Sequence, residues 1–260
     1  MLALKHHKLN AWFGQESLRD ADPRVHLSNI AWTTATKTGY GENTGRDGRR
    51  RHRIRRDVLR ITIEFSLFEY LDIEARECAI EAVNAWARDG YLEISTKPDR
   101  RVWVQCTQRA SVEDARNHNA SFSLVFETAD APFWEDAHPA VFTLTGATAA
   151  TTARIPGTRE SAPAEVTVKA VGGALNSLTL ALGESEMEFE NLGIAQGQSL
   201  ILGHDENGYL TIASSAGASK YGKRTGESDD ELTAEAGDAT ISFNANVACD
   251  VEISVWGRYK

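Results

Sequence analysis

Hydrophobic and polar positions alternate along much of this chain. In residues 57–68, DVLRITIEFSLF, four apolar side chains occupy every second position: Ile61, Ile63, Phe65 and Leu67. A period of two is typical of a strand with one buried face. Shorter stretches of the same kind predict strands at residues 9–14, 24–32, 91–95, 101–107 and 120–127.

One helix interrupts these strands, at about residues 72–89. Asp72 is placed to cap its first turn, and Gly90 can take the left-handed conformation that ends a helix. Ala79, Val83 and Trp86 share one face at i, i+4 and i+7 spacing, so we expect this face to pack against a sheet. The N-terminal half is therefore predicted to be an α+β split barrel that carries one helix.

The C-terminal half lacks a helical pattern. Short alternating runs recur at intervals of roughly 8–12 residues between glycine, asparagine and aspartate turns, which is typical of an antiparallel sandwich or jelly roll. Pro132 and Pro139 bracket Phe133 and Trp134 at the most plausible boundary. We predict a mainly β protein with an N-terminal domain at 1–132, a linker at 133–142 and a C-terminal β-sandwich at 143–260.

Residues 33–56 form a polar stretch punctuated by glycines. It is too long for a tight turn and predicts an extended arm or a flexible loop. Eight arginines lie between Arg46 and Arg60. The candidate contact residues of this arm are Arg46, Arg49, Arg50, Arg51, Arg53, Arg55 and Arg56.

Three interpretations of these arginines stay open at this point. Guanidinium groups neutralise phosphates, so the arm could bind nucleic acid, although it has few aromatic residues for stacking bases. Guanidinium groups also form bidentate pairs with carboxylates, so the arm could lie on an acidic surface of a neighbouring subunit. The third interpretation is a solvated loop. We favour the subunit contact because the whole chain is acidic, with a net charge of −9.

That charge is unevenly distributed. Residues 1–132 hold 20 Lys and Arg against 19 Asp and Glu, and residues 133–260 hold 8 against 18. The two parts therefore carry +1 and −10. This asymmetry predicts surfaces with different neighbours.

Sequence signatures of catalysis are missing. The chain has no G-x-S-x-G elbow, no P-loop, and no pair of histidines at metal-ligand spacing. Glu188 and Glu190 alternate with Met187 and Phe189, which favours one polar strand face over an acid–base pair. We therefore predict no catalytic residue, no metal and no cofactor. The N-terminus lacks the apolar core of a signal peptide and no apolar stretch matches a membrane span, so we expect a soluble, cytosolically made protein with no membrane partner.

The three cysteines, Cys78, Cys106 and Cys249, lie far apart in the sequence. They match neither a disulfide framework nor a C-x-x-C metal site. We predict buried free thiols.

The order of these elements resembles that of the distal tail protein family of long-tailed bacteriophages. The resemblance rests on the strand LRITIEFSL, the helix and strand AIEAVNAWARDGYLEIS, the hairpin into RVWVQCT, the strand SFSLVFETADAPFWED and the final run VEISVWGRY. The exit from the first domain carries an aromatic-rich pattern at Phe126, Asp130, Pro132 and Phe133. The resemblance spans nearly the whole chain.

This resemblance implies a fold and a structural role. The N-terminal domain would be related to tail-tube proteins, with the face of Ala79, Val83 and Trp86 holding the helix on the outside of the barrel, and the C-terminal domain would be galectin-like. Such proteins form a ring, typically hexameric, that joins the tail tube to the baseplate or tail tip and leaves a channel for DNA. The implied location is the distal end of the virion tail, after assembly in the host cytoplasm.

The implied partners are other copies of the chain, the tail tube protein and the tail-tip or baseplate hub protein, with receptor-binding or side-fibre proteins on the C-terminal domain. No specific nucleic acid is implied. The alternatives are a carbohydrate-binding β-sandwich for host attachment and a nucleic-acid-binding accessory protein.

Overall fold

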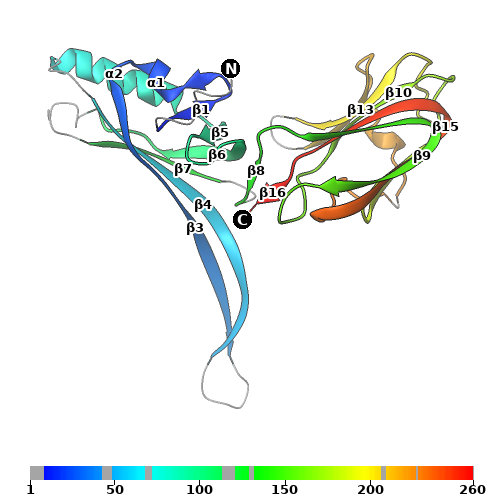
Figure 1. Cartoon of the computed structure of the whole chain (residues 1–260), viewed down its shortest axis with the longest axis horizontal. Coiled ribbons are helices and arrows are strands. Elements are labelled where there is room, and N and C mark those ends of the chain that lie inside the picture. Colours follow the sequence, from blue (N-terminus) through cyan, green and yellow to red (C-terminus); the bar gives the residue numbers. More distant parts are fainter. Residues whose placement is uncertain are drawn as a thin grey trace. The chain divides into compact units, whose positions relative to one another are not determined.

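The protein is mainly β, which confirms the predicted fold class. The computed structural model divides into two compact units, Met1–Trp134 and Glu135–Lys260, which are called the first and second unit below (Figure 1). The structure describes residues 9–42, 49–67, 72–112, 121–128, 132–205, 209–226 and 228–259.

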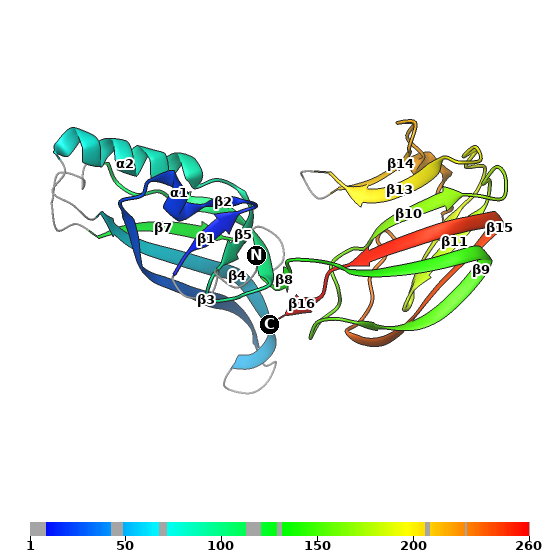
Figure 2. The ribbon, with the colours of Figure 1, turned by 45° about the horizontal axis from the view of Figure 1, so that its top comes forward.

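The first unit is a curved antiparallel sheet that carries a helix on one face (Figure 2). Its strands lie in the order β2-β1-β5-β6-β7-β4-β3. They are β1 (Ala11–Phe13), β2 (Glu16–Ser17), β3 (Val25–Glu42), β4 (Arg49–Leu67), β5 (Gly90–Ile94), β6 (Arg100–Gln108) and β7 (Phe122–Glu127). The helices are α1 (Leu18–Ala21) and α2 (Ile73–Trp86). The four alternating apolar residues of β4 are all buried.

Helix α2 starts where the sequence predicts and ends earlier. The side chain of Asp72 accepts a hydrogen bond from the backbone N–H of Ala75 at 2.7 Å and caps the first turn. Ala87 already has an extended backbone, and Asp89 accepts a hydrogen bond from the N–H of Cys106 on β6. Gly90, predicted to end the helix, instead opens β5 with a φ of +144° that favours glycine. The helix is therefore three residues shorter than the range 72–89 at its end.

The inward face of α2 is completely covered. Ala79, Ile80 and Val83 are fully buried, and Trp86 is 6% exposed. The ring of Trp86 lies 4.9 Å from that of Phe13 on β1. Arg76, on the same helix, is also buried, which the apolar spacing did not predict.

The second unit is an antiparallel β-sandwich. Its sheet order is β12-β11-β15-β10-β13-β14, and β9 pairs with β15. The strands are β9 (Ala140–Ile155), β10 (Glu165–Ala170), β11 (Leu178–Leu182), β12 (Ser185–Phe189), β13 (Ser199–His204), β14 (Leu210–Ser214) and β15 (Gly237–Val255). Two short strands, β8 (Trp134–Asp136) and β16 (Arg258–Tyr259), pair with each other.

Strand β15 organises both layers of this sandwich. Its first part pairs with β11 and its second part with β10, and an irregularity lies between Asn244 and Cys249. Such an irregularity bends a strand, so one strand contributes to two layers. The core between them is built from the inward residues of every long strand, among them Leu180, Phe243 and Ile253.

The predicted linker region is largely strand. Trp134 closes the first unit and Glu135 opens the second, so β8 contains the boundary. Strand β9 already begins at Ala140 and runs for 16 residues, although the sequence pattern did not predict a strand there.

Gly257 lies where the second unit tolerates no side chain. A Cβ at this position would come within 2.6 Å of the backbone carbonyl of Pro156 and 2.7 Å of Oδ2 of Asp136. We expect Gly257→Ala to destabilise the second unit by about 1–3 kcal/mol, because backbone atoms must move. Urea unfolding measures this, with Gly226→Ala as the control, since no atom lies within 4 Å of that Cβ. Equal midpoints for the two variants would contradict the expectation.

All three cysteines are free thiols, but only Cys249 is buried. Cys106 is partly covered and Cys78 is exposed on α2, so the prediction of burial was wrong for these two. Desolvation raises the pKa of the Cys106 and Cys249 thiols, which keeps both protonated at neutral pH. Within the described residues, no helix is long and apolar enough to cross a membrane.

Candidate assembly surfaces

The first unit has a long open edge. Strand β3 is 18 residues long, ends the sheet order, and pairs with β4 on one side; no other described strand pairs with its outer side. Such an edge presents a row of backbone N–H and C=O groups that another chain can pair with. Trp32 on this strand is 36% exposed, with Lys97 over its ring at 5.2 Å.

Strands β3 and β4 continue beyond the sheet as a two-stranded ribbon (Figure 1). The pairing of β4 with β7 covers only Arg60–Phe65, while β3 and β4 stay paired from Thr36↔Arg56 to Glu42↔Arg49. We call residues 36–42 and 49–56 the ribbon. Irregularities at Thr34/Thr36 and Thr38/Tyr40 place extra residues on β4, which bends the hairpin.

The ribbon carries the arginines that the sequence singled out. Six of the seven lie on β4: Arg49, Arg50, Arg51, Arg53, Arg55 and Arg56. Arg46 lies outside the described residues. Of the two predicted forms of this segment, extended arm or flexible loop, the described part is an extended arm.

The ribbon has a strong positive charge. It holds Lys37 and six arginines against Glu42, a net charge of +6 with histidine neutral. A two-stranded ribbon is also marginally stable in water by itself. Both properties favour an anionic neighbour.

One segment of the second unit, residues 217–226 and 228–230, lies beside both β14 and β12, and we call it the strap. At β14 the strap lies beside the outer edge. The carbonyl of Ala218 accepts a hydrogen bond from the N–H of Ser214 at 2.8 Å, and the N–H of Lys220 donates to the carbonyl of Ile212 at 2.7 Å. The strap then turns through a short 3-10 helix, η2 (Tyr221–Lys223), and reaches β12.

At β12 the strap satisfies the outward backbone groups with its own backbone. The N–H of Thr225 donates to the carbonyl of Glu188 at 2.9 Å, and the N–H of Asp229 donates to the carbonyl of Glu186 at 2.8 Å. Just past the strand, the N–H of Glu190 donates to the carbonyl of Lys223 at 3.0 Å.

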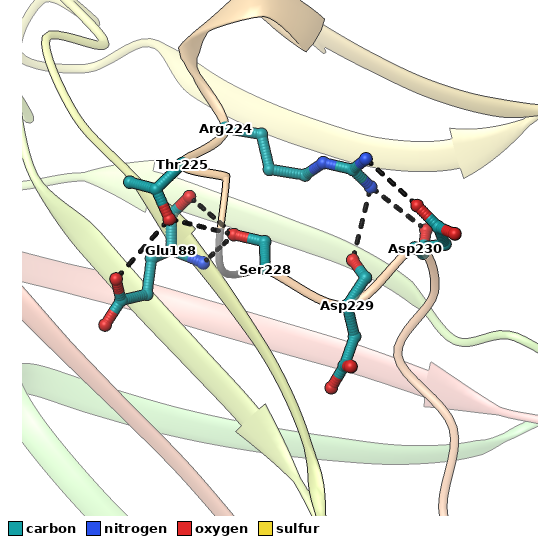
Figure 3. Close-up of polar contacts among 6 residues, drawn as sticks. All are labelled: Glu188, Arg224, Thr225, Ser228, Asp229 and Asp230. Atoms are coloured by element: carbon teal, nitrogen blue, oxygen red, sulfur yellow. Dashed lines mark hydrogen bonds and ion pairs between the residues drawn. The ribbon is translucent and has the colours of Figure 1, made fainter.

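Side chains of the strap complete this coverage, as Figure 3 shows for Glu188. The N–H of Glu188 donates to the hydroxyl of Ser228 at 2.8 Å, and that hydroxyl also lies 3.1 Å from the carbonyl of Glu188. The N–H of Glu186 donates to the carboxylate of Asp229 at 2.8 Å. The outward N–H groups of residues 186, 188 and 190 therefore all have partners.

Arg224 fixes the shape of the strap. Its guanidinium donates to the backbone carbonyls of Asp229 and Asp230 and to the carboxylate of Asp230 at 3.1 Å (Figure 3). It also lies 5.2 Å from the centre of the Tyr221 ring. The side chain is only 16% exposed. This cation offsets the acidic residues that the strap brings beside β12.

A hollow of about 340 Å³ lies on the second unit, lined by residues in or next to β11, β12 and β15. Its lining is mainly polar, and Glu188 and Glu190 share it, as their alternation predicts. The residues are Ser177, Leu178, Thr179, Glu188, Phe189, Glu190, Asn244, Ala245 and Asn246. Ligand pockets are lined mostly by apolar and aromatic side chains, but Phe189 here points into the core and is 1% exposed. Trp256 is also buried. Neither offers a saccharide an aromatic surface.

In the described part of the chain, no three His, Cys, Asp or Glu side chains come close enough together to hold a metal ion. The sequence-predicted residues fall into two places: Ala79, Val83 and Trp86 under α2, and the arginines on the ribbon. Sequence reasoning missed the strap and Arg224. Their only signal was a polar run with Gly222 and Gly226, which is typical of any loop.

No family model matches this sequence, and no curated protein matches it significantly. Solved structures do match. The Dit protein of phage SPP1, described as a paradigm of the hub adsorption apparatus in phages that infect Gram-positive hosts, has a TM-score of 0.69 and 12% identity. The match covers 96% of this chain and 99% of that chain.

Two structures of the phage P2 baseplate in its activated conformation also match. The one with Ca has a TM-score of 0.53 and the one with Sr 0.51, both at 9% identity. They cover 96% of this chain and 98% and 97% of theirs. The chain therefore has the fold of phage tail hub and baseplate proteins, as the resemblance to the distal tail family implied.

Proposed function

We propose that this chain is a structural protein of a phage tail, a member of the distal tail family that forms a closed, hexameric ring. The ring joins the tail tube to the baseplate or tail tip and leaves a channel for DNA. The likeness in fold to the SPP1 Dit protein over both units supports this role. Within the chain, the observation that carries the proposal is the long open edge of β3 and its continuation as the ribbon.

An open edge of 18 residues favours assembly. Soluble proteins commonly cover such an edge or shorten it, because it otherwise recruits other chains. The opposite end of the same sheet is β2, which has only two residues. The proposed ring needs a heterologous contact, in which β3 meets a different surface of the neighbouring copy, and such a contact repeated about an axis closes into a ring.

The ribbon extends the same contact. Its charge of +6 fits a carboxylate-rich surface on a neighbouring copy, where guanidinium forks form bidentate pairs. The second unit supplies acidic residues, since residues 133–260 carry −10. The role proposed for Arg46, Arg49, Arg50, Arg51, Arg53, Arg55 and Arg56 is subunit contact, and nucleic acid is not the proposed ligand.

The remaining parts of the proposal follow from this ring. Its partners are the tail tube protein and the tail-tip or baseplate hub protein, with receptor-binding or side-fibre proteins on the second unit. It lies at the distal end of the virion tail after assembly in the host cytoplasm. The role is structural and needs no catalytic residue or cofactor.

Electron microscopy of the purified full-length chain tests the proposal. We expect closed rings with a central pore, viewed end-on in class averages. Raising the salt concentration should dissociate them, because exposed ion pairs of the ribbon are screened. Single chains at every accessible protein concentration and at low salt would contradict the ring.

A further inference from the structure

Among the described residues, three strands of the second unit, β9, β12 and β14, pair with another strand of the sheet on one side only. The strap covers the outer sides of β12 and β14. We propose that the strap is an edge guard, which prevents the second unit from pairing β12 and β14 with a strand of another chain. This inference goes beyond the proposed ring and does not depend on it.

The completeness of the hydrogen bonding supports this role. On β12 the outward groups of Glu186 and Glu188, both N–H and C=O, are bonded to the strap, and the N–H of Glu190 is bonded as well. On β14 the outward N–H of Ser214 and the carbonyl of Ile212 are bonded. A partner strand therefore finds these backbone groups already bonded until the strap leaves.

The acidic residues of the strap and of β12 explain why the strap needs Arg224 to stay bound to this strand. The strap carries Asp229 and Asp230 next to a strand that carries Glu186 and Glu188, and like charges at this spacing repel. Arg224 binds the carboxylate of Asp230 and two backbone carbonyls, so one partly buried guanidinium holds the acidic end of the strap in place. Removing this side chain should release the strap from β12.

The test compares Arg224→Ala with Lys223→Ala in the full-length chain. Lys223 is the neighbouring cation and is exposed, so its replacement removes the same charge without the carbonyl contacts. In Arg224→Ala we expect the amides of residues 186, 188 and 190 to exchange hydrogen roughly tenfold faster or more, because contacts to a charged donor are lost. Lys223→Ala should leave these rates unchanged.

Release of the strap should also produce assemblies that are larger than those of the wild type, whatever the stoichiometry of the wild-type protein. The expected product is a second copy paired along β12, detected as a concentration-dependent rise in mass by light scattering. The assay uses about 0.5 M salt, where the Debye length is roughly 4 Å and the glutamates of β12 repel each other little.

A proline on β12 separates strand pairing from unfolding. The N–H of Glu188 faces the strap and not β11, so Glu188→Pro removes an edge donor and keeps the ladder to β11. Added to Arg224→Ala, it should return the mass to the wild-type value.

Ser228→Ala serves as a second variant, since it removes the hydroxyl partner of the Glu188 N–H. Faster exchange in Arg224→Ala or Ser228→Ala with no new association would overturn the edge guard, and so would association that survives Glu188→Pro. Unchanged exchange in both variants would overturn it as well. A failed ring would change none of these readouts.

Discussion

Replacing Trp86 by alanine is expected to lower the free energy of unfolding of the first unit by about 3–5 kcal/mol. The indole is 6% exposed and packs against the rings of Phe13, at 4.9 Å, and Phe126, at 6.3 Å. Its N–H also donates to the backbone carbonyl of Glu16 at 3.1 Å. The substitution therefore leaves a cavity under α2 and removes a hydrogen bond from that carbonyl.

Urea unfolding of the full-length chain, followed by circular dichroism, measures this loss. Glu81→Ala is the matched control, because Glu81 lies on the exposed face of the same helix. We expect the control to change stability by less than about 0.5 kcal/mol. A loss below about 1 kcal/mol for Trp86→Ala would mean that α2 is not held by this contact.

Deleting the tip of the hairpin, residues 39–53, is expected to abolish the oligomer and leave both units folded. Thr38 and Ile54 are partners in the β3–β4 register, so an Asn-Gly turn can join them directly. The deletion removes five of the seven candidate arginines. Four of these lie on the described ribbon, and the fifth is Arg46; the five are Arg46, Arg49, Arg50, Arg51 and Arg53. It leaves every strand of the first-unit sheet in place, because β4 pairs with β7 at Arg60–Phe65, outside the deleted residues.

Folding of the deletion variant needs its own readout. The pairing of β4 with β7, from Arg60 to Phe65, lies outside the deleted residues. We therefore expect the urea midpoints and the near-ultraviolet circular dichroism to match those of the wild-type monomer. A variant that loses these signals is unfolded, so its mass does not test the subunit contact.

The sequence predicted most accurately those helices and strands that have one buried face and one face exposed to solvent. In β4 the apolar residues Ile61, Ile63 and Phe65 are buried, and Arg60 and Glu64 are exposed. In α2 the 3.6-residue period placed Ala79, Val83 and Trp86 on one face, all of which are buried. Burial on one side is the physical cause of both periods, so both could be read from the sequence.

Strand β9 was missed for a physical reason. Its sequence from Gly146 to Ala153 contains only glycine, alanine and threonine, and most of these residues lie exposed or half-buried. Without large inward side chains there is no alternation to detect. The strand forms because β15 pairs with it along its length, which is a contact between residues about a hundred positions apart.

The strap was missed for a related reason. Its bonds to β12 join backbone groups near 186–190 to groups near 223–229, and backbone groups leave no residue-type signal. Ser228, Thr225 and Asp229 are ordinary loop residues until the fold brings them to an edge. Arg224 likewise gains its role only from the carbonyls that the fold places beside it.

Light scattering on the wild-type chain and on the 39–53 deletion variant tests the central claim most directly, which is that the first unit assembles into a closed ring through the β3 edge and the ribbon. One chain has a mass of 28.5 kDa. We expect a single discrete multiple of this mass for the wild type at low salt and the mass of one chain for the folded deletion variant. A folded deletion variant that keeps the wild-type multiple, or a wild type that never exceeds one chain, would contradict the claim.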